Sequence, residues 1–479
     1  MEHWNEQNLR TFFSKSADVK IHLHTLGEPP NLHKVLLIYC EGMADTKPIN
    51  DYVLPALETS LKVQVPEGEE RHLPEKILDL ASISLDRFED AVTLIYSGHL
   101  VLFFTAEREL YSLDVANLPH RTPEESSTEV SVKGPRDAFT EELSMNVALV
   151  RKRLRSNNLC NESFVVGRRS KTRVSLLYMD DVIRPAIVEE ARQRLQSLDI
   201  DALFGSSQLE ELLADTKYPL FPMFDYIGRP DFIADCLVRG RFAIVVDGSP
   251  MAIIGPANLT LLIKSPEDLY LPFYFVVLER ILRIMGLFIS ILLPGFWVAV
   301  SSFNLDQIPF PLLATIVSSK LGLPVSGALD FYFMLGLFEL FREAGLRLPR
   351  AVGQTVAVVG GLIVGDAAIR AGITAPTTLV ISAITSVASF TLVNQSLNGT
   401  VSVLRIFILT FSSMLGMYGF FLSILATVLY LSVQRSFGAS YLSPLSPPIF
   451  REWLQALLTK PLRLQKKRPG ILETKDPTR

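Results

Sequence analysis

Residues 352–370 read VGQTVAVVGGLIVGDAAIR, and this stretch decides how the rest of the chain is interpreted. Small residues recur at every fourth position along it: Gly353, Ala357, Gly361 and Gly365. On a helix they form one smooth ridge against which another backbone can pack closely. A carboxylate, Asp366, lies near the end of the run, and a charge at the centre of a membrane helix costs about 2.5–3.5 kcal/mol, so such residues usually face protein or water. The stretch therefore predicts a membrane helix that packs against other helices around something polar.

Long apolar runs surround this stretch. Residues 284–303 are twenty residues without a charge, and a helix needs roughly 20 to cross the bilayer core. Residues 371–404 contain no charged side chain, and residues 406–433 are a further apolar run. The residues before 280, in contrast, alternate charged and apolar segments as a soluble protein does. We predict an integral membrane protein with a large soluble portion.

Termini, cysteines and charge limit the compartment and the partners. The opening MEHWNEQNLRTFF has mixed charge and no apolar core, so it does not predict a signal peptide, and the soluble portion is expected in the cytosol. Cys40, Cys160 and Cys236 are widely separated and show no CxxC spacing, which fits a reducing compartment and argues against a thiolate-bound metal. A net charge of −4 gives no indication of nucleic-acid binding.

The soluble portion reads as two small α/β subdomains in series. The first, residues 1–117, has buried strand patterns at 35–41 and 99–105 and amphipathic helical patterns near 49–61 and 84–96. Residues 118–136 are rich in Pro, Glu and Ser and predict a linker. The second subdomain, residues 137–270, is predicted with helices near 137–155, 184–197, 207–215 and 230–239 and strands near 162–167, 173–179, 242–246 and 251–255. No internal repeat is apparent.

The C-terminal part predicts an all-α polytopic membrane domain at residues 271–440, followed by a cytosolic tail at 441–479, which makes the fold class an α+β membrane protein. Four spans are expected: residues 284–303, 352–369, 377–397 and 404–433. Charged residues interrupt the segment 307–346, which fits an interfacial or re-entrant hairpin better than a lipid-facing span. Arg280 and Arg283 precede the first span and a basic tail follows the last, so both ends are expected in the cytosol.

Several motifs outside the membrane region have ordinary structural interpretations. Asp247-Gly248-Ser249-Pro250 lies between two strand-like runs and predicts a hairpin turn rather than a catalytic pair. The segment 167–172, GRRSKT, lacks the second glycine of a phosphate loop and is read as a basic turn. His22 and His24 share one face of a strand, but no third ligand is indicated, so packed or surface histidines are favoured over a metal site.

An enzymatic function finds no support in the motifs. All seven histidines lie within the first 120 residues, which excludes a histidine proton relay in the membrane. Neither GxSxG, nor HExxH, nor a paired-carboxylate constellation occurs. We therefore expect a protein that is not an enzyme and needs no metal or cofactor.

The polar and small residues of the membrane region leave alternatives open. The ridge fits packing within one subunit and packing between subunits around a pore equally well. Asp366 and Arg370 are four apart, so they fit either an intrahelical ion pair or a carboxylate ring at a pore mouth. Glu339, Arg342 and Glu343 are best explained as a charged interfacial turn.

Segments from residue 135 to the C-terminus resemble the A subunits of GerA-type bacterial spore germinant receptors. The resemblance rests on PEDLYLPFYFVVLERILRIMG, FELFREAGLRLP, VGQTVAVVGGLIVGDAAIRAG, RSFGASYLSP and KKRPGILETKDPTR, together with GRRSKTRVSLLYMDDV and RPDFIADCLVRGRFAIVVDGSP upstream. Residues 1–134 match only in general pattern. This chain departs from the family at residues 389–395, SFTLVNQ, where a proline-containing turn is typical.

The resemblance implies a multi-pass protein of the spore inner membrane with a cytosolic N-terminal region. It implies a homo-oligomer, a pentamer, that forms a nutrient-gated cation channel and works with a transporter-like B subunit and a C-subunit lipoprotein. The channel segment would be residues 352–370.

On such a helix, Val356, Val359 and Ile363 lie on a face beside the glycines and could form a dewetted gate, with Asp366 near the pore mouth. The alternative is a non-conducting signalling or scaffold subunit that relays the nutrient signal to a separate channel. A secondary transporter would predict paired inverted repeats, and none is apparent.

Overall fold

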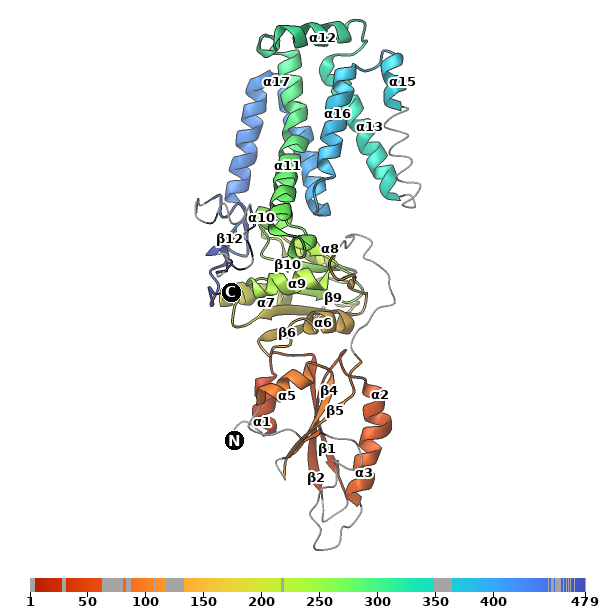
Figure 1. Ribbon diagram of the computed structural model, residues 1–479, viewed down its shortest axis with the longest axis vertical. Coiled ribbons are helices and arrows are strands. Elements are labelled where there is room, and N and C mark those ends of the chain that lie inside the picture. The colour runs from red at the N-terminus through yellow and green to blue at the C-terminus, as the bar shows by residue number, and fades with distance from the viewer. Residues whose placement is uncertain are drawn as a thin grey trace.

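In the computed structural model of the chain, two sheet-bearing units stand below a bundle of helices (Figure 1). The structure describes residues 5–27, 32–62, 81–82, 88–106, 109–117, 133–216, 219–347, 364–446 and scattered positions from 448 to 478. The statements below refer to these residues.

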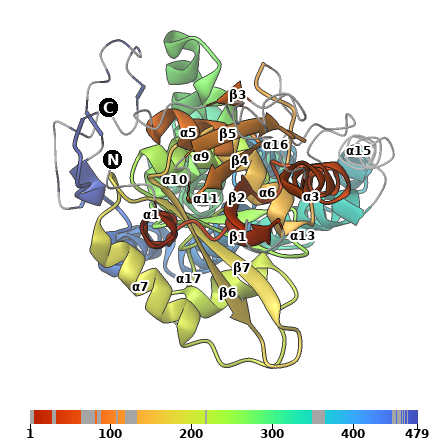
Figure 2. The same ribbon diagram turned by 90° about the horizontal axis from the view of Figure 1, so that it is seen from below.

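The first unit is a sheet with helices on both faces. Its strands are β1 (Val19–Leu26), β2 (His33–Cys40), β3 (Ala81–Ser82), β4 (His99–Phe104) and β5 (Glu109–Asp114), paired antiparallel in the order β1-β2-β4-β5-β3. Helices α1 (Glu6–Phe12) and α5 (Phe88–Ile95) lie on one face (Figure 2). On the other face lie α2 (Thr46–Pro48), the π-helical turn η1 (Ile49–Val53) and α3 (Leu54–Lys62). The central strands are buried on both faces, which explains their continuous apolar runs.

The second unit is built in the same way. Its strands are β6 (Leu159–Val166), β7 (Thr172–Met179), β8 (Asp225–Ile227), β9 (Phe242–Val246) and β10 (Ala252–Gly255), antiparallel in the order β6-β7-β9-β10-β8. Helices α7 (Pro185–Gln196) and α8 (Ser206–Leu213) cover one face. Helices α6 (Leu143–Arg151) and α9 (Pro230–Val238) cover the other. Each predicted helix and strand of this unit is present, whereas the short strand β8 was not predicted.

The two units share one topology. In both, a helix precedes two paired strands, helices lead to a short edge strand, and a further helix leads to a closing hairpin. The strand order of the second sheet, β6-β7-β9-β10-β8, therefore repeats that of the first, β1-β2-β4-β5-β3. No repeat is apparent in the sequence, because the two units share their topology and not their residue identities.

A buried ion pair joins the units. Asp18 of the first unit accepts hydrogen bonds from Arg151 Nε and Nη2, both at 2.9 Å, and the two side chains are 5% and 0% exposed. The Arg151 guanidinium also lies 4.1 Å from the ring centroid of Tyr96. The backbone of Asn161 exchanges hydrogen bonds with Lys15 and Ala17 at 2.8 and 2.9 Å. The units thus meet through specific polar contacts rather than only through the segment 118–136.

The bundle begins with α11 (Phe273–Ser302), which continues above the second unit from α10 (Leu259–Leu262) and the 3-10 turn η2 (Pro266–Leu269) (Figure 1). Asp268 of this turn accepts hydrogen bonds from Arg280 and Arg283, both at 2.8 Å, which fixes the base of α11. After the turn η3 (Leu305–Gln307), α12 (Phe310–Lys320) lies across the far end. Next come α13 (Gly327–Arg347), α15 (Gly365–Arg370), α16 (Pro376–Ser389) and α17 (Gln395–Val433).

Among the described helices, α11 and α17, the latter counted over its whole length, are long and apolar enough to cross a membrane. The predicted span 284–303 lies in α11 up to its last residue, Ser302. The predicted span 377–397 begins in α16, an apolar helix of 14 residues that ends at Ser389, and its remaining residues form the loop and the start of α17. The predicted span 352–369 lies largely outside the described residues. Four spans are therefore not confirmed.

Helix α17 is a hairpin and not the single span predicted at 404–433. Gly416 has φ 60° and ψ −139°, which breaks the helix. Thr400 Oγ1 donates to Leu220 O at 2.6 Å, and Tyr430 Oη accepts from Leu220 N at 3.1 Å. These positions on α17 are separated by 30 residues, about 45 Å along a straight helix, so only a reversal at Gly416 lets both contact Leu220. The two arms lie on either side of α11 in Figure 1.

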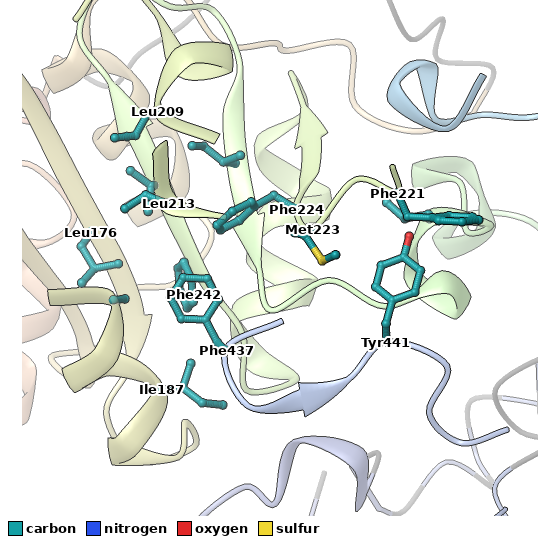
Figure 3. Packing of buried hydrophobic residues seen from close by; sticks show 14 of the residues in the cluster. Leu176, Ile187, Leu209, Leu213, Phe221, Met223, Phe224, Phe242, Phe437 and Tyr441 are labelled. Carbon is teal, nitrogen blue, oxygen red and sulfur yellow. The ribbon is translucent and has the colours of Figure 1, made fainter. Parts of the chain in front are cut away.

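The chain after α17 enters the core of the second unit. A short ladder pairs β11 (Arg435–Ser436) with β12 (Ala439–Ser440), and the turn between them inserts Phe437 against Phe242 and Phe224, with ring centroids 4.9 and 5.5 Å apart (Figure 3). Tyr441 packs beside Phe221 at 5.8 Å. These buried aromatic rings fix the lower end of the second arm of α17 to the second unit.

The C-terminal residues also dock on the second unit. Arg468 Nε donates to Val238 O at 2.8 Å, and Lys475 N donates to Val182 O at 2.9 Å. Leu472, in the 3-10 turn η6 (Gly470–Leu472), is buried. The C-terminus therefore lies on the same side of the bundle as the two sheet-bearing units.

Candidate functional site

A row of polar side chains on α13 faces the first arm of α17 inside the bundle. The row comprises Tyr332, Glu339 and Arg342, which recur at helical spacing with the buried Leu335 between them. Its partners on α17 are Ser402, Arg405 and Thr410. We call this set of six side chains the polar ladder.

Charges concentrate at the end of the ladder nearer the second unit. Glu339 is shared by two cations, because Arg342 Nη2 lies 2.6 Å from one carboxylate oxygen and Arg405 contacts the other. Arg342 and Arg405 also donate to Ser402 Oγ, both at 3.2 Å. Arg405 is 2% exposed, and its Nε has no hydrogen-bond partner among the described residues. One carboxylate therefore pairs with two guanidinium groups, and the buried Arg405 Nε has no acceptor among the described residues.

Neutral and capping contacts continue the connection toward the far end. Tyr332 Oη and Thr410 Oγ1 lie 2.8 Å apart. Asp330, in the first turn of α13, is 1% exposed, and its Oδ2 accepts from the backbone N–H of Ala375 at 3.3 Å, at the start of α16. A carboxylate at two helix N-termini is stabilised by both helix dipoles. Asp330 thereby ties α13 to α16.

The inner face of α16 is lined by hydroxyl groups. The buried positions at helical spacing are Thr378, Ser382, Thr385 and Ser389. Thr385 Oγ1 donates to Ile381 O at 2.8 Å, whereas Ser382 Oγ has no partner among the described residues. A buried row of hydroxyls is an unusual lining for helices that face only lipid, and it gives the bundle a polar interior.

These contacts correct the interpretation of residues 339–343 as an interfacial turn. The residues lie within a continuous helix, α13, in which Glu339 pairs with Arg342 and Arg405 inside the bundle, while Glu343 is on the exposed side. Arg405 was missed as a functional candidate. Its signal was a lone arginine between the uncharged run 371–404 and the apolar run 406–433, which requires a buried partner.

The predicted pore residues fall mostly outside the described part of the chain. The gate residues Val356, Val359 and Ile363 and the ridge residues Gly353, Ala357 and Gly361 lie there. Gly365 is described and buried, and a Cβ at this position would lie 3.2 Å from the Leu379 side chain of α16. Asp366 forms the intrahelical ion pair with Arg370 at 2.9 Å, with both side chains mostly exposed. Of the two interpretations of Asp366, the intrahelical ion pair is therefore the one present in the structure.

The loop at residues 390–394 couples α16 and α17 to the second unit. Asn394 caps α17 by accepting from Leu397 N at 3.0 Å, and its Nδ2 donates to Asp225 of β8 at 2.6 Å. Burial raises the pKa of Asp225 to about 6. Burial, with the nearby Asp225 charge, raises the pKa of Glu210 on α8 to about 7. The departure from the family at 389–395 is thus an anchored loop capped by Asn394.

The motifs of the soluble units have the structural roles expected for them. Residues 247–250 form the turn between β9 and β10, with Gly248 at φ 80°. Residues 167–171 turn between β6 and β7, where Arg168 pairs with Asp199. His22 Nε2 lies 3.5 Å from Tyr39 Oη. The described residues contain no group of three His, Cys, Asp or Glu side chains that could hold a metal ion.

Comparisons with known proteins identify the family. The family model for the Bacillus/Clostridium GerA spore germination protein matches residues 7–471. The chain is similar to spore germination protein XA of Bacillus anthracis, with 39% identity over 99% of this chain and 97% of the relative. It is also similar to spore germination protein KA of Bacillus subtilis, with 33% identity over 97% of this chain and 85% of that protein.

A solved structure also matches part of the chain. The N-terminal domain of the A subunit of the Bacillus megaterium spore germinant receptor GerK3 matches 54% of this chain and 96% of that one, with 28% identity and a TM-score of 0.39. The family match over nearly the whole length is the finding that decides the assignment. The chain belongs to the GerA family of spore germination proteins.

Proposed function

We propose that the chain is the A subunit of a nutrient germinant receptor and forms a homo-oligomeric, nutrient-gated cation channel. The observation that carries the proposal is the polar ladder, because charged side chains paired inside a membrane bundle are costly and usually mark an ion path or a switch. Family membership supplies the germination context.

In this proposal the soluble units (1–117 and 137–270, with the linker 118–136) and the tail (441–479) are cytosolic. The membrane domain (271–440) lies in the spore inner membrane. Helices 352–370 of several copies, five in a pentamer, pack through the ridge. Val356, Val359 and Ile363 form the gate, and Asp366 lies at the pore mouth. A transporter-like B subunit and a C-subunit lipoprotein complete the receptor.

The anchors of α17 suggest how a signal would reach the gate. Both arms of this hairpin contact the second unit, at Leu220, and the first arm holds α13 through Arg405 and Glu339. A displacement of the second unit would therefore move α17 and, through the ladder, α13. A partner can drive this change only by contacting the two arrangements with different affinity.

The test is cation flux from liposomes that contain the purified chain with its receptor partners. Nutrient is expected to raise the flux, and Gly361→Leu is expected to abolish both oligomer formation and flux because the ridge can no longer pack closely. Gly399→Ala serves as the matched control, since a Cβ there meets no atom within 4 Å. A receptor that relays germination signals while its liposomes stay tight would support the non-conducting subunit instead.

A further inference from the structure

Helix α12 lies across the far end of the bundle, crosswise to α11 (Figure 1). It has 11 residues and is about 16 Å long, so it is too short to cross a bilayer core of about 30 Å. Ile316 packs in a buried cluster with Val300 and Ile308, and Lys320 Nζ donates to Ser301 O at 3.0 Å. These contacts fix α12 to the end of α11.

The exposed surface of α12 is divided into an apolar side and a polar side. Phe310, Val317 and Leu321 are spaced seven and four residues apart, so they lie on the same side of the helix. Their exposed fractions are 80%, 44% and 77%. Thr315 and Ser318 lie on the other exposed side, and their hydroxyl groups donate to carbonyl groups of the same helix. An apolar stripe of three side chains thus points away from the bundle.

The depth of α12 in a membrane follows from α11. Arg280 and Arg283 precede the uncharged run 284–303, whose twenty residues match the thickness of the bilayer core. The upper boundary of the core then lies at the end of this run, directly before η3. The exposed Asp306 is part of η3, and Lys320 is the last residue of α12. Charged groups at both ends of α12 are expected at the level of the lipid headgroups, where helices parallel to the membrane lie.

We propose that α12 is an interfacial helix that inserts Phe310, Val317 and Leu321 into the far leaflet of the membrane, opposite the sheet-bearing units. The inference rests on the membrane placement of the helical domain proposed above. Transfer of exposed apolar side chains from water to the acyl chains is favourable, and the hydroxyl-bearing side stays toward water. The segment 307–346 was expected to be interfacial as a whole, whereas α13 is part of the bundle and only α12 remains for this role.

The experiment measures the depth of nitroxide spin labels on the full chain in liposomes of phosphatidylglycerol and phosphatidylethanolamine. One label is attached through Val317→Cys, and the matched control is the neighbouring Ser318→Cys on the polar side. Phe288→Cys, exposed within the uncharged run of α11, gives the value for lipid, and Phe204→Cys, exposed on the second unit, gives the value for water. The three native cysteines are buried, and wild type taken through the same labelling gives the background.

Collisions of the label with oxygen, which is apolar and concentrates in lipid, are compared with collisions with a water-soluble nickel chelate. The ratio of oxygen to nickel collisions at Val317 should shift toward the value at Phe288, whereas the ratio at Ser318 should stay closer to the value at Phe204. A Val317 label as open to nickel as the Phe204 label would overturn the proposal.

Two further outcomes separate this inference from the membrane placement on which it rests. A Val317 label that is shielded from both reagents would indicate that protein covers this side, a second copy or a receptor partner, and would overturn lipid as the occupant. A Phe288 label that also gives the value for water would contradict the membrane placement itself, and the inference with it. A lipid value at Phe288 with a water value at Val317 contradicts the inference alone.

Discussion

Replacing Glu339 by glutamine removes the carboxylate that Arg342 and Arg405 share between α13 and α17. The shape of the side chain is nearly unchanged, so the variant tests the charge rather than the packing. Glutamine keeps one carbonyl oxygen, which can accept from only one of the two guanidinium groups, and the amide NH2 that replaces the other oxygen cannot accept. Arg405 would then have only neutral acceptors, such as Ser402 Oγ at 3.2 Å, while its Nε stays unpaired. The bundle would then contain a guanidinium group that is 2% exposed and has no counter-charge.

The expected loss follows from these contacts. Breaking a buried ion pair by removing one partner typically costs about 3–5 kcal/mol. Glu339 is 26% exposed on its side chain, so water can replace part of the lost contact, and we expect the lower end, about 3 kcal/mol. This corresponds to roughly a hundredfold shift between the arrangements in which α13 is attached to α17 and detached from it.

The assay is the resting cation leak of liposomes that contain the full chain, measured together with its thermal unfolding. Liposomes with Glu339→Gln should leak more and the variant should melt lower, whereas Glu211→Gln, on the exposed face of α8, should resemble the wild type. Adding Arg405→Met to Glu339→Gln removes the orphaned charge and should restore much of the loss of stability. A Glu339→Gln variant that behaves as Glu211→Gln does, or a double variant no more stable than the single one, would refute the role of the shared carboxylate.

The remaining predictions concern the anchors of the bundle. Gly416→Ala should lower the free energy of unfolding by about 1–3 kcal/mol or more, because the backbone conformation suits glycine and a Cβ would lie 2.8 Å from Phe303 Cβ. Thermal unfolding in detergent compares this variant with Gly399→Ala, and equal unfolding midpoints would contradict the prediction. Phe437→Ala should cost about 3–5 kcal/mol and expose residues 435–441 to protease, because the buried ring contacts Phe224 and Phe242; Phe204→Ala, whose ring is 77% exposed, should have little effect. The pKa of Asp225 is raised from 3.8 to about 6, so the folded chain binds the carboxyl proton more tightly than the unfolded chain does. Protonation of Asp225 therefore stabilises the fold fully below about pH 4, and this stabilisation is lost as the pH rises to about 6. Asp225→Asn should not lose this stability as the pH rises. If the melting temperatures of wild type and variant change with pH in the same way from pH 4 to 7, the prediction is contradicted.

Local patterns in the sequence predicted every helix of the second unit and all of its strands except β8. The helical patterns near 184–197, 207–215 and 230–239 correspond to α7, α8 and α9, and the Asp247-Gly248 turn joins β9 and β10. The edge strand β8 was missed because a strand of three residues carries too little alternation to be recognised. The shared topology of the two units could not be seen either, since strand order depends on contacts distant in sequence.

The candidate site depended on long-range pairing that local patterns do not contain. Glu339 and Arg405 are 66 residues apart, so each appeared in the sequence as an isolated charge. Glu339 was assigned to an interfacial turn, and Arg405 was given no role. Gly416 lies in an apolar run without proline, and such a run reads as one continuous helix. Only the contacts of Thr400 and Tyr430 with Leu220 reveal the hairpin.

The central claim, that this GerA-family chain conducts cations under nutrient control, is tested most directly by electrical recording. The complete purified receptor is placed in a planar bilayer and nutrient is added to either side. We predict discrete, cation-selective current steps that require nutrient and disappear with Gly361→Leu. A bilayer that stays silent, although the same receptor preparation binds nutrient, would contradict the claim.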